Sequence, residues 1–295
     1  MGRLHLYNYA SPSASPIALD LIDFPAGNTD FHPLGIEYNA PSKTLFVVNH
    51  AVQGSRLEVF KLHAAEHFAT HIRTIVHPLI HSPNSIAVVD EENIYVTNDH
   101  FFLVRYHRLL ALMETYLALP IGNVVHVHIP TKPSTTAPIV AKRVARLAFA
   151  NGVKMLDSET VAVSSTSNTA VNLYTRDSTT NGLKFKETIS LPFLPDNLSV
   201  DRNGRLLIAG HGHVGALNNF AKTRALCRSG SGGEAQEACK LTATSYVAEW
   251  SAYGGLRTLY LDDRFSSSST AVRDVKSGVG IVTGLYENGI LVWKE

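Results

Sequence analysis

The stretch Asn84-Ser-Ile-Ala-Val-Val, followed by Asn93-Ile-Tyr-Val-Thr-Asn-Asp99, decides the fold. It joins a short apolar strand to a second apolar strand through a polar turn. The same pattern returns at three other places, which start at Gly35, Asn151 and Asp196 and lead into second strands at 44–50, 160–164 and 205–211. An internal repeat of this kind predicts a fold that is built from similar supersecondary units.

The spacing of the repeat predicts a β-propeller. Units that start at Gly35, Ser85, Gly152, Asn197 and Val272 follow one another at intervals of 45 to 75 residues. A four-stranded blade takes about 40 to 50 residues, and longer intervals hold insertions. The first unit shows four strands in order, at 35–38, 44–49, 57–62 and 71–76. We therefore expect an all-β propeller that forms one domain over residues 1–295.

Composition narrows the class of protein. The chain has 295 residues and a formal net charge of +1, so charge gives no reason to expect a nucleic-acid partner. It contains no run of 18 apolar residues, and its start lacks the charged-then-apolar layout of a secretory signal. The compartment is left open by the sequence.

Two segments interrupt the strand pattern. Residues 107–118 hold good helix formers and predict one amphipathic helix. We expect it to pack on the propeller; the alternatives are a lid and contact with a membrane or partner. Residues 228–237 are rich in Gly and Ser and predict a mobile loop between Cys227 and Cys239, which form either a disulfide or two free thiols. Residues 131–138 also predict a loop. The apolar stripe of the helix is formed by Leu109, Leu112, Met113, Tyr116 and Leu117.

Polar residues recur where the innermost strand of each blade starts. Such starts converge on the central channel of a propeller. A carboxylate and three amide oxygens suit Ca²⁺ better than Zn²⁺, which prefers imidazole and thiolate. The sequence therefore predicts a calcium site, although Asn and Asp at turns into strands also act as simple caps. The predicted metal ligands are Asn84, Asn151, Asp196 and Asn197.

Histidines recur at the ends of the second strands, at His50, His100 and His211. An imidazole there is a candidate general base for a water molecule beside the metal, which would give metal-assisted hydrolysis. The structural alternative for each is a hydrogen-bonded strand end. Asp99, which precedes His100, either orients that imidazole or satisfies the turn.

The chain resembles the serum paraoxonase/arylesterase family of calcium-dependent lactonases, whose fold is a six-bladed propeller. Two sequence motifs are fairly specific for this family, Thr97-Asn-Asp-His-Phe-Phe102 and Phe149-Ala-Asn-Gly152. They are accompanied, in order over almost the whole chain, by Phe31-His-Pro-Leu-Gly-Ile36, Leu45-Phe-Val-Val-Asn-His50, Leu57-Glu-Val-Phe-Lys61 and Asp196-Asn-Leu-Ser-Val-Asp201.

The resemblance implies roles for individual residues. Asn84, Asn151, Asp196 and Asn197 match four ligands of the family's catalytic calcium, and His50 matches one member of its histidine pair. His211, His100 and Asp99 match further pocket positions. The helix at 107–118 is similar to the family's lid helix, which is linked there to lipid surfaces. Lactones and aryl esters are the implied substrates.

Three departures from the family pattern affect the expected chemistry. The second histidine of the pair falls on Leu34, with His32 two residues away. The family's glutamate ligand and the aspartate of its structural calcium lie upstream of Met1, and Ser85 replaces an acidic ligand of that second site. A sixth blade would likewise need strands upstream of Met1, so we expect a truncated form of the family, and a secreted or endomembrane location if a leader is missing.

These observations leave three functional hypotheses. The first is a carboxylic-ester hydrolase with calcium, with His50 and His211 as catalytic residues and a small lactone or ester as substrate. The second is a non-catalytic propeller that serves as a binding module, which Leu34 favours. The third is a propeller enzyme of the strictosidine-synthase or gluconolactonase type.

Overall fold

The computed structural model describes residues 2–25, 30–130, 138–230 and 232–294. The chain divides into two compact units. Unit 1 comprises Met1–Ser167 and Asn172–Glu187, and unit 2 comprises Asn168–Val171 and Thr188–Glu295. The single domain of the sequence analysis stays a prediction, and residues 131–137 of the predicted loop lie outside the described residues.

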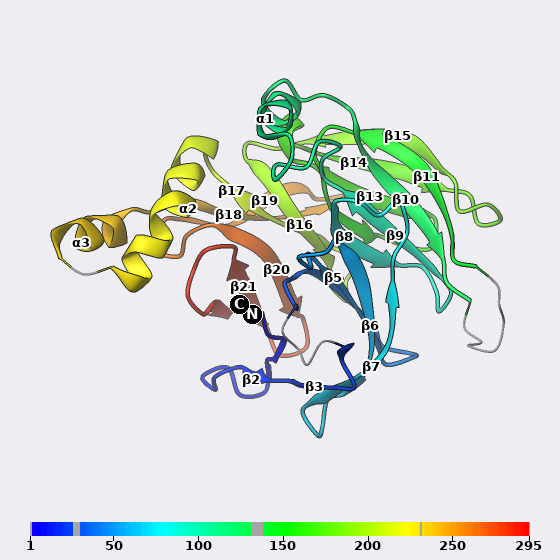
Figure 1. Cartoon of the computed structure of the whole chain (residues 1–295), viewed down its shortest axis with the longest axis horizontal. Coiled ribbons are helices and arrows are strands. Elements are labelled where there is room, and N and C mark those ends of the chain that lie inside the picture. The colour runs from blue at the N-terminus through cyan, green and yellow to red at the C-terminus, as the bar shows by residue number, and fades with distance from the viewer. Residues whose placement is uncertain (1, 26–29, 131–137, 231, 295) are drawn as a thin grey trace. The chain divides into compact units, whose positions relative to one another are not determined.

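Unit 1 contains two antiparallel sheets that we call blades 1 and 2, together with most of blade 3 (Figure 1). A short hairpin, β1 (His5–Leu6) with β2 (Ile17–Ala18), precedes them, and β3 (Asp20–Ile22) pairs in parallel with β7. Blade 1 consists of β4 (Pro33–Asn39), β5 (Thr44–Asn49), β6 (Arg56–His63) and β7 (Phe68–Ile75). Blade 2 consists of β8 (Pro83–Val88), β9 (Asn93–Asn98), β10 (Gly122–His128) and β11 (Val140–Leu147).

Three further sheets of the same type follow along the chain. Blade 3 consists of β12 (Ala150–Met155), β13 (Thr160–Ser165), β14 (Ala170–Arg176) and β15 (Leu183–Ser190). Blade 4 consists of β16 (Leu194–Val200), β17 (Leu206–His211), β18 (Ser245–Ser251) and β19 (Gly255–Asp262). Blade 5 has β20 (Ser268–Asp274), β21 (Val279–Gly284) and β22 (Ile290–Lys294). The described residues thus confirm an all-β fold with five propeller-type blades, and the sixth blade stays a prediction.

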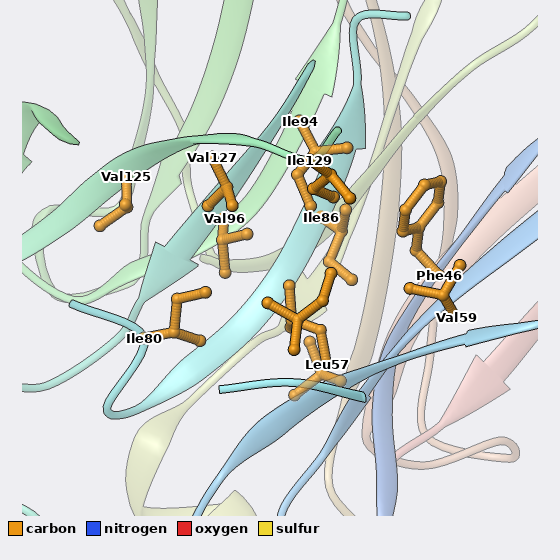
Figure 2. Packing of buried hydrophobic residues seen from close by; sticks show 12 residues of the cluster. Phe46, Leu57, Val59, Ile80, Ile86, Ile94, Val96, Val125, Val127 and Ile129 are labelled. Atoms are coloured by element: carbon orange, nitrogen blue, oxygen red, sulfur yellow. The ribbon is translucent and has the colours of Figure 1, made fainter. Parts of the chain in front are cut away.

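Blades 1 and 2 pack face to face through a shared apolar core (Figure 2). The inner strands are therefore buried on both faces, which explains why β5 reads as a continuous apolar run, Leu45 to Val48, instead of alternating. Burial of such side chains stabilises the fold by about 1.5 to 3 kcal/mol each. The cluster comprises Phe46, Val48, Leu57, Val59 and Ile75 from blade 1, with Ile80, Ile86, Ile94, Val96, Val125, Val127 and Ile129 from blade 2 and its flanks.

A β-bulge interrupts the innermost strand of blades 1 to 4 at the same register. In blade 2 the pairs Pro83↔Asn98 and Ile86↔Val96 flank it, so that two residues oppose one. A bulge of this kind bends the strand and re-aims a side chain, which is why bulges often lie beside functional sites. The paired bulge residues are Leu34–Gly35, Asn84–Ser85, Asn151–Gly152 and Asp196–Asn197.

The described residues form three α-helices, whereas the sequence predicted one. The expected one is present as α1 (Arg108–Tyr116). The mobile loop predicted at 228–237 is wrong, because α2 (Val214–Ser229) and α3 (Gly233–Lys240) occupy most of that region. Ala, Leu, Lys and Arg in α2 are good helix formers, a signal that the Gly/Ser run obscured. Cys227 and Cys239 join these helices in a disulfide, which decides between the two states left open.

Helix α1 packs through other residues than the apolar stripe that the sequence analysis identified. The helix buries Ala111 and Glu114, whereas the five apolar side chains of the predicted stripe are all exposed. Leu109 is 70% exposed and Leu117 is 61% exposed. In the described part of the chain, no helix has the length and apolar character to cross a bilayer.

Candidate functional site

In blades 2 and 3 the first residue of the bulge is hydrogen-bonded to the residue that follows the second strand, and in blade 4 it lies beside the last residue of that strand. Asn84 Nδ2 donates to Asp99 Oδ2 over 3.2 Å. In blade 3 the equivalent bond runs from Asn151 Nδ2 to Thr166 Oγ1, over 3.1 Å. In blade 4 His211 Nε2 lies 3.3 Å from Asp196 Oδ2. Three different residue pairs therefore make the same local contact, which makes this position a structural repeat.

In blades 2 and 3 this contact leaves an amide oxygen available. Because Asn84 and Asn151 are held through their nitrogen atoms, each side chain presents Oδ1 away from its anchor. Asn151 is buried, and its Oδ1 has no hydrogen-bond partner among the described residues. A buried carbonyl oxygen without a partner costs about 1 to 3 kcal/mol, so it calls for a bound group. A calcium ion, which prefers such oxygens, fits this donor.

The bulges of unit 1 are also linked to one another. Thr97, the residue opposite the blade 2 bulge, accepts from Ser85 N over 3.0 Å and donates to Asn151 O over 2.6 Å. A Cβ on Gly35 would lie 2.1 Å from Asn84 O, so β4 and β8 touch at their bulges and glycine is required there. Unit 1 therefore brings Leu34, Asn84 and Asn151 into one continuous arrangement.

Both ring nitrogens of His100 have partners in this arrangement. Its Nδ1 lies 3.1 Å from Asp99 Oδ1, and its Nε2 lies 2.7 Å from Thr115 Oγ1. The hydroxyl of Thr115 donates to Ala111 O, so it can only accept from His100, and in the protonated ring both nitrogens act as donors. Burial disfavours the charge, but the hydrogen bond and charge of Asp99, with the charge of Glu114, outweigh it and raise the pKa of His100. Asp99 thus orients His100, as the sequence analysis considered.

Glu114 explains how α1 is attached. Its carboxylate accepts from Phe101 N over 2.8 Å and from Phe102 N over 3.0 Å. The side chain is buried, so these bonds satisfy its charge. In the sequence Glu114 is recognisable only as part of a helical run. Its contact with the neighbouring loop leaves no periodic signal.

Blade 1 lacks the polar pair. Leu34 occupies the first bulge position, is 39% exposed, and cannot make a hydrogen bond with its side chain. His50, at the strand end, is exposed, and its Nε2 instead contacts Pro83 O over 2.6 Å. Because a carbonyl only accepts, Nε2 carries the proton, and Nδ1 of the neutral ring is free to take one. His32 does not replace the pair, since its Nε2 lies 3.6 Å from Asp30 Oδ1.

Unit 2 holds the other predicted residues. Asp196 and His211 are buried, and Asp196 Oδ2 lies 3.3 Å from His211 Nε2. His211 Nδ1 is buried without a hydrogen-bond partner among the described residues. Asn197, the second bulge residue, is half-buried beside this pair. Within unit 2 the structure therefore brings together a carboxylate and an imidazole with a free acceptor.

Two residues of the arrangement escaped the sequence analysis. Thr166 and Thr97 look like ordinary strand-end and strand residues, but they orient Asn151 and join two bulges. A signal did exist, since Thr166 directly follows β13 as Asp99 directly follows β9.

Known proteins with similar sequences support the family resemblance that the sequence segments indicated. The family model Arylesterase matches residues 3–225. Serum paraoxonase/arylesterase 2 from Gallus gallus is 33% identical over 199 residues, which is 66% of this chain and 52% of the relative. Serum paraoxonase/arylesterase 1 from Mus musculus is 30% identical over 204 residues, covering 68% of this chain and 54% of the relative. The chain thus spans about half the length of the curated relatives it matches.

Solved structures support the fold alone. A protein from Bacteroides uniformis that is provisionally named a 6-phosphogluconolactonase has a TM-score of 0.58 at 10% identity, covering 99% of this chain and 87% of its own. A protein provisionally named a gluconolactonase has a TM-score of 0.57 at 14% identity, with 99% and 81% covered. Both likenesses agree with a propeller-type architecture. Because the family model covers most of the sequence, this chain belongs to the arylesterase family.

Proposed function

We propose that this chain is a carboxylic-ester hydrolase that opens lactones and cleaves aryl esters with the help of calcium. The observation that carries the proposal is the buried Oδ1 of Asn151, which has no hydrogen-bond partner among the described residues while Nδ2 is tied to Thr166. Asn84 of the same unit is anchored in the same way. The names of the curated relatives, which include arylesterase and paraoxonase, agree with this chemistry.

Within unit 1, Asn84 and Asn151 would hold calcium through their side-chain oxygens. The resemblance to the paraoxonase family also implies calcium-ligand roles for Asp196 and Asn197 of unit 2. When bound to such oxygen donors, calcium stabilises the negative charge that develops on an ester carbonyl. Ser85 carries no acidic group where the family's structural site has one, so we propose no second, structural ion.

His50 is the proposed general base. Its Nε2–H is committed to Pro83 O, which fixes the tautomer and leaves Nδ1 as the proton acceptor. In the proposed step a water oxygen bonds to the acyl carbon and a water proton passes to Nδ1. The acyl C–O bond of the ester then breaks, and the departing oxygen takes the proton from Nδ1, which releases the alcohol or phenol or, in a lactone, leaves a hydroxyl on the opened chain. His211 is the second candidate, because its Nδ1 is also free. His50→Gln and His211→Gln distinguish the two by their effect on kcat.

Calcium binding and turnover are tested separately. We expect calcium to raise the Tm of the purified chain, because a ligand that binds the folded state stabilises it, and to be required for hydrolysis of phenyl acetate and δ-valerolactone. Asn151→Ala should abolish both effects, Asn151→Asp should keep the Tm rise, and Asn219→Ala, an exposed helix residue, should change neither. Hydrolysis that survives chelation, or no Tm rise, would reject the proposal.

A non-catalytic binding module is the second candidate, and Leu34 is the observation that favours it. With Leu34 in place of a polar residue, blade 1 supplies only His50 to the chemistry. A calcium-dependent rise of Tm with no turnover of either substrate would support this reading over the enzyme. Turnover that needs no metal would instead favour a strictosidine-synthase-type propeller.

A peripheral lipid contact is also proposed for α1. The helix and the loop before it expose apolar side chains, among them Tyr106, Leu109, Tyr116 and Leu117, beside Arg105 and Arg108. Such a mixture suits the interface of an anionic bilayer. Sedimentation with phosphatidylserine vesicles should capture the wild type and lose Leu109→Ser/Leu117→Ser, whose Tm should be unchanged. Equal capture of both would reject the contact.

A further inference from the structure

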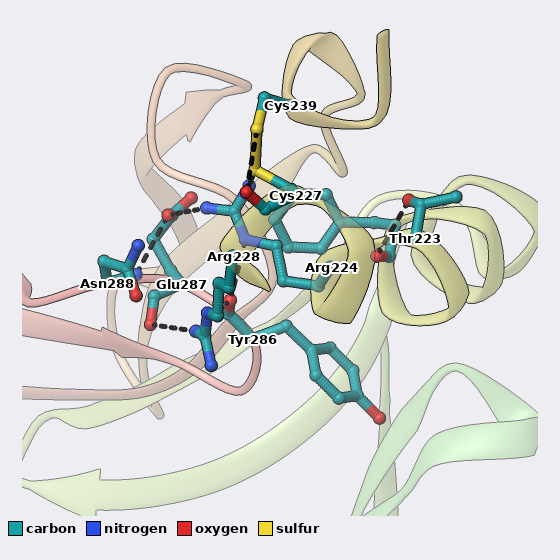
Figure 3. Close-up of a disulfide and its surroundings, with 9 residues drawn as sticks. Thr223, Arg224, Cys227, Arg228, Cys239, Tyr286, Glu287 and Asn288 are labelled. Carbon is teal, nitrogen blue, oxygen red and sulfur yellow. Dashed lines mark hydrogen bonds and ion pairs between the residues drawn. A yellow bond between two sulfur atoms is a disulfide. The ribbon is translucent and has the colours of Figure 1, made fainter. Parts of the chain in front are cut away.

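Helix α2 in unit 2 holds the turn between β21 and β22 (Figure 3). Arg224 Nε and Arg228 Nη2 donate to Tyr286 O over 3.1 and 2.9 Å. Arg224 Nη2 also pairs with Glu287 Oε1 at 2.5 Å, and these two side chains are only 12% and 15% exposed. Each group of this clamp is bonded, so the position of Tyr286 is set by the helix.

The clamp is reinforced from both sides. Glu287 Oε2 accepts from Ser266 N over 3.1 Å, and Tyr286 N donates to Ser267 Oγ over 3.1 Å. The guanidinium of Arg224 lies over the buried ring of Phe220, 4.6 Å from its centroid. One turn further along α2, Cys227 is joined to Cys239 of α3, which ties the helical hairpin together. A side chain on so well-fixed a turn loses little rotational freedom when it binds a ligand.

The turn lies at the same end of unit 2 as Asp196 and His211. Ser268, which pairs with Gly284 at the end of β21, donates to Gly210 O over 2.6 Å, and Gly210 precedes His211. Helix α2 starts three residues after His211, with His213 as its N-cap. The side chain of Tyr286 points away from the disulfide (Figure 3).

The phenol of Tyr286 is half-buried and uncommitted. Its hydroxyl has no hydrogen-bond partner in the part of the chain that the structure describes. Burial, and after it the negative charge of Asp196, raise the pKa of Tyr286, so the hydroxyl keeps its proton and can donate. A half-buried donor on a rigid turn, within the field of a carboxylate, is typical of a ligand-binding position.

We propose that Tyr286 is a substrate-binding residue whose hydroxyl donates a hydrogen bond to a lactone or ester oxygen, and that Arg224 on the disulfide-linked helix positions it. This inference rests on the proposed function for its substrate class. It adds a residue of blade 5, and a positioning helix, to the proposed site residues of unit 2. The partner chemistry is an acyl oxygen, because a protonated hydroxyl donates a hydrogen bond and an ester oxygen accepts one.

The test uses binding, so that it does not depend on turnover. The probe is δ-valerolactam, the amide counterpart of a lactone that an esterase hydrolyses far more slowly, and its Kd is measured by calorimetry with calcium present. Loss of one hydrogen bond should weaken binding about fivefold in Tyr286→Phe, since such a bond contributes about 1 kcal/mol. The matched control Tyr253→Phe, a fully exposed tyrosine of unit 2, should bind as the wild type does.

A double-mutant cycle tests the positioning role. Arg224→Gln should weaken lactam binding about three- to fivefold in the wild-type background and add nothing in the Tyr286→Phe background, because both changes remove the same contact. An equal loss in both backgrounds would mean that Arg224 acts only on the fold. Cys227→Ser/Cys239→Ser should weaken binding less than Arg224→Gln does.

The outcomes separate the two proposals. Lactam binding that Tyr286→Phe does not change, or wild-type protein that does not bind the lactam at all, would overturn the role of Tyr286. Wild-type protein that binds the lactam through Tyr286 but hydrolyses no ester would leave this inference standing and reject the proposed function.

Discussion

Blades 1 and 2 have the same strands and the same bulge, yet they differ in what the bulge presents. Asn84 in blade 2 is paired with Asp99, whereas Leu34 in blade 1 has no such bond and His50 turns to Pro83 O. In both blades, a buried amide at the end of the second strand binds the segment before the first. The fold and the chemistry are thus carried by adjacent but separate positions, so one can change while the other is kept.

The strand-end amides show what the fold requires. Asn49 accepts from His32 N over 2.8 Å and donates to Asp30 O over 3.0 Å. Asn98 accepts from His81 N and Ser82 N and donates to Leu79 O, at 2.8 to 3.1 Å. These contacts span the same sequence separations in the two blades. In blade 3 the shorter side chain of Ser165 takes the place of the amide and donates to Ala148 O over 2.6 Å.

The largest expected effect is the loss of a strand-end amide. Asn98→Ala should lower the free energy of unfolding by about 3 kcal/mol, because it leaves buried backbone groups and Asn123 without partners. Asn98→Ser, which copies blade 3, should lose about half as much. Urea denaturation measures both. Equal stability of wild type and Asn98→Ala would mean that the amide does not support the blade.

A smaller loss is expected at the contact between the two bulges. Gly35→Ala should destabilise unit 1 by about 2 kcal/mol, since its Cβ would lie 2.1 Å from the backbone oxygen of Asn84. Gly233→Ala is the matched control, because no atom lies within 4 Å of its added Cβ. Thermal unfolding of the two variants compares them directly, and a Gly35→Ala protein as stable as wild type would contradict the close approach of β4 and β8.

The raised pKa of His100 predicts that the stability of the protein depends on pH. Its pKa is raised in the folded state, so its stabilising contribution is fully present below its ordinary pKa of about 6.5 and is lost as the pH rises through the folded-state value. We expect the Tm difference between wild type and His100→Gln to shrink between about pH 5.5 and about pH 8.5. A difference that grows with pH would show that the ring is neutral in the fold.

The smallest effect on stability is expected at Leu34, where the consequence for activity is the informative one. Leu34→His should change the free energy of unfolding by less than about 1 kcal/mol, because Leu34 is 39% exposed. If the resemblance to the paraoxonase family holds for the histidine pair, kcat for phenyl acetate should rise about tenfold. Leu34→Gln, a polar control that cannot act as a base, should not raise it.

The repeat could be predicted because it depends on local chemistry. Apolar runs such as Leu45 to Val48, and polar residues at their entries, are visible in the chain, and the strands they predict agree with β5, β9, β13 and β17. Helices α2 and α3 were missed because a Gly/Ser run suggested a loop. The exposed stripe of α1 was misassigned because periodicity shows that one face is apolar but does not show what covers it.

The sequence by itself determined the blade pattern, the family and the identity of the bulge residues, since these follow from residue types at fixed spacing. Only the tertiary structure decided which atoms those residues present. Asn151 shows Oδ1 because Thr166 holds Nδ2, and His50 keeps Nδ1 free because Pro83 O takes Nε2–H. The pKa of His100 is raised because the hydrogen bond and charge of Asp99, with the charge of Glu114, outweigh burial. These states depend on partners from distant parts of the chain, and hydrogen-bond geometry, unlike periodicity, is fixed only when those partners meet.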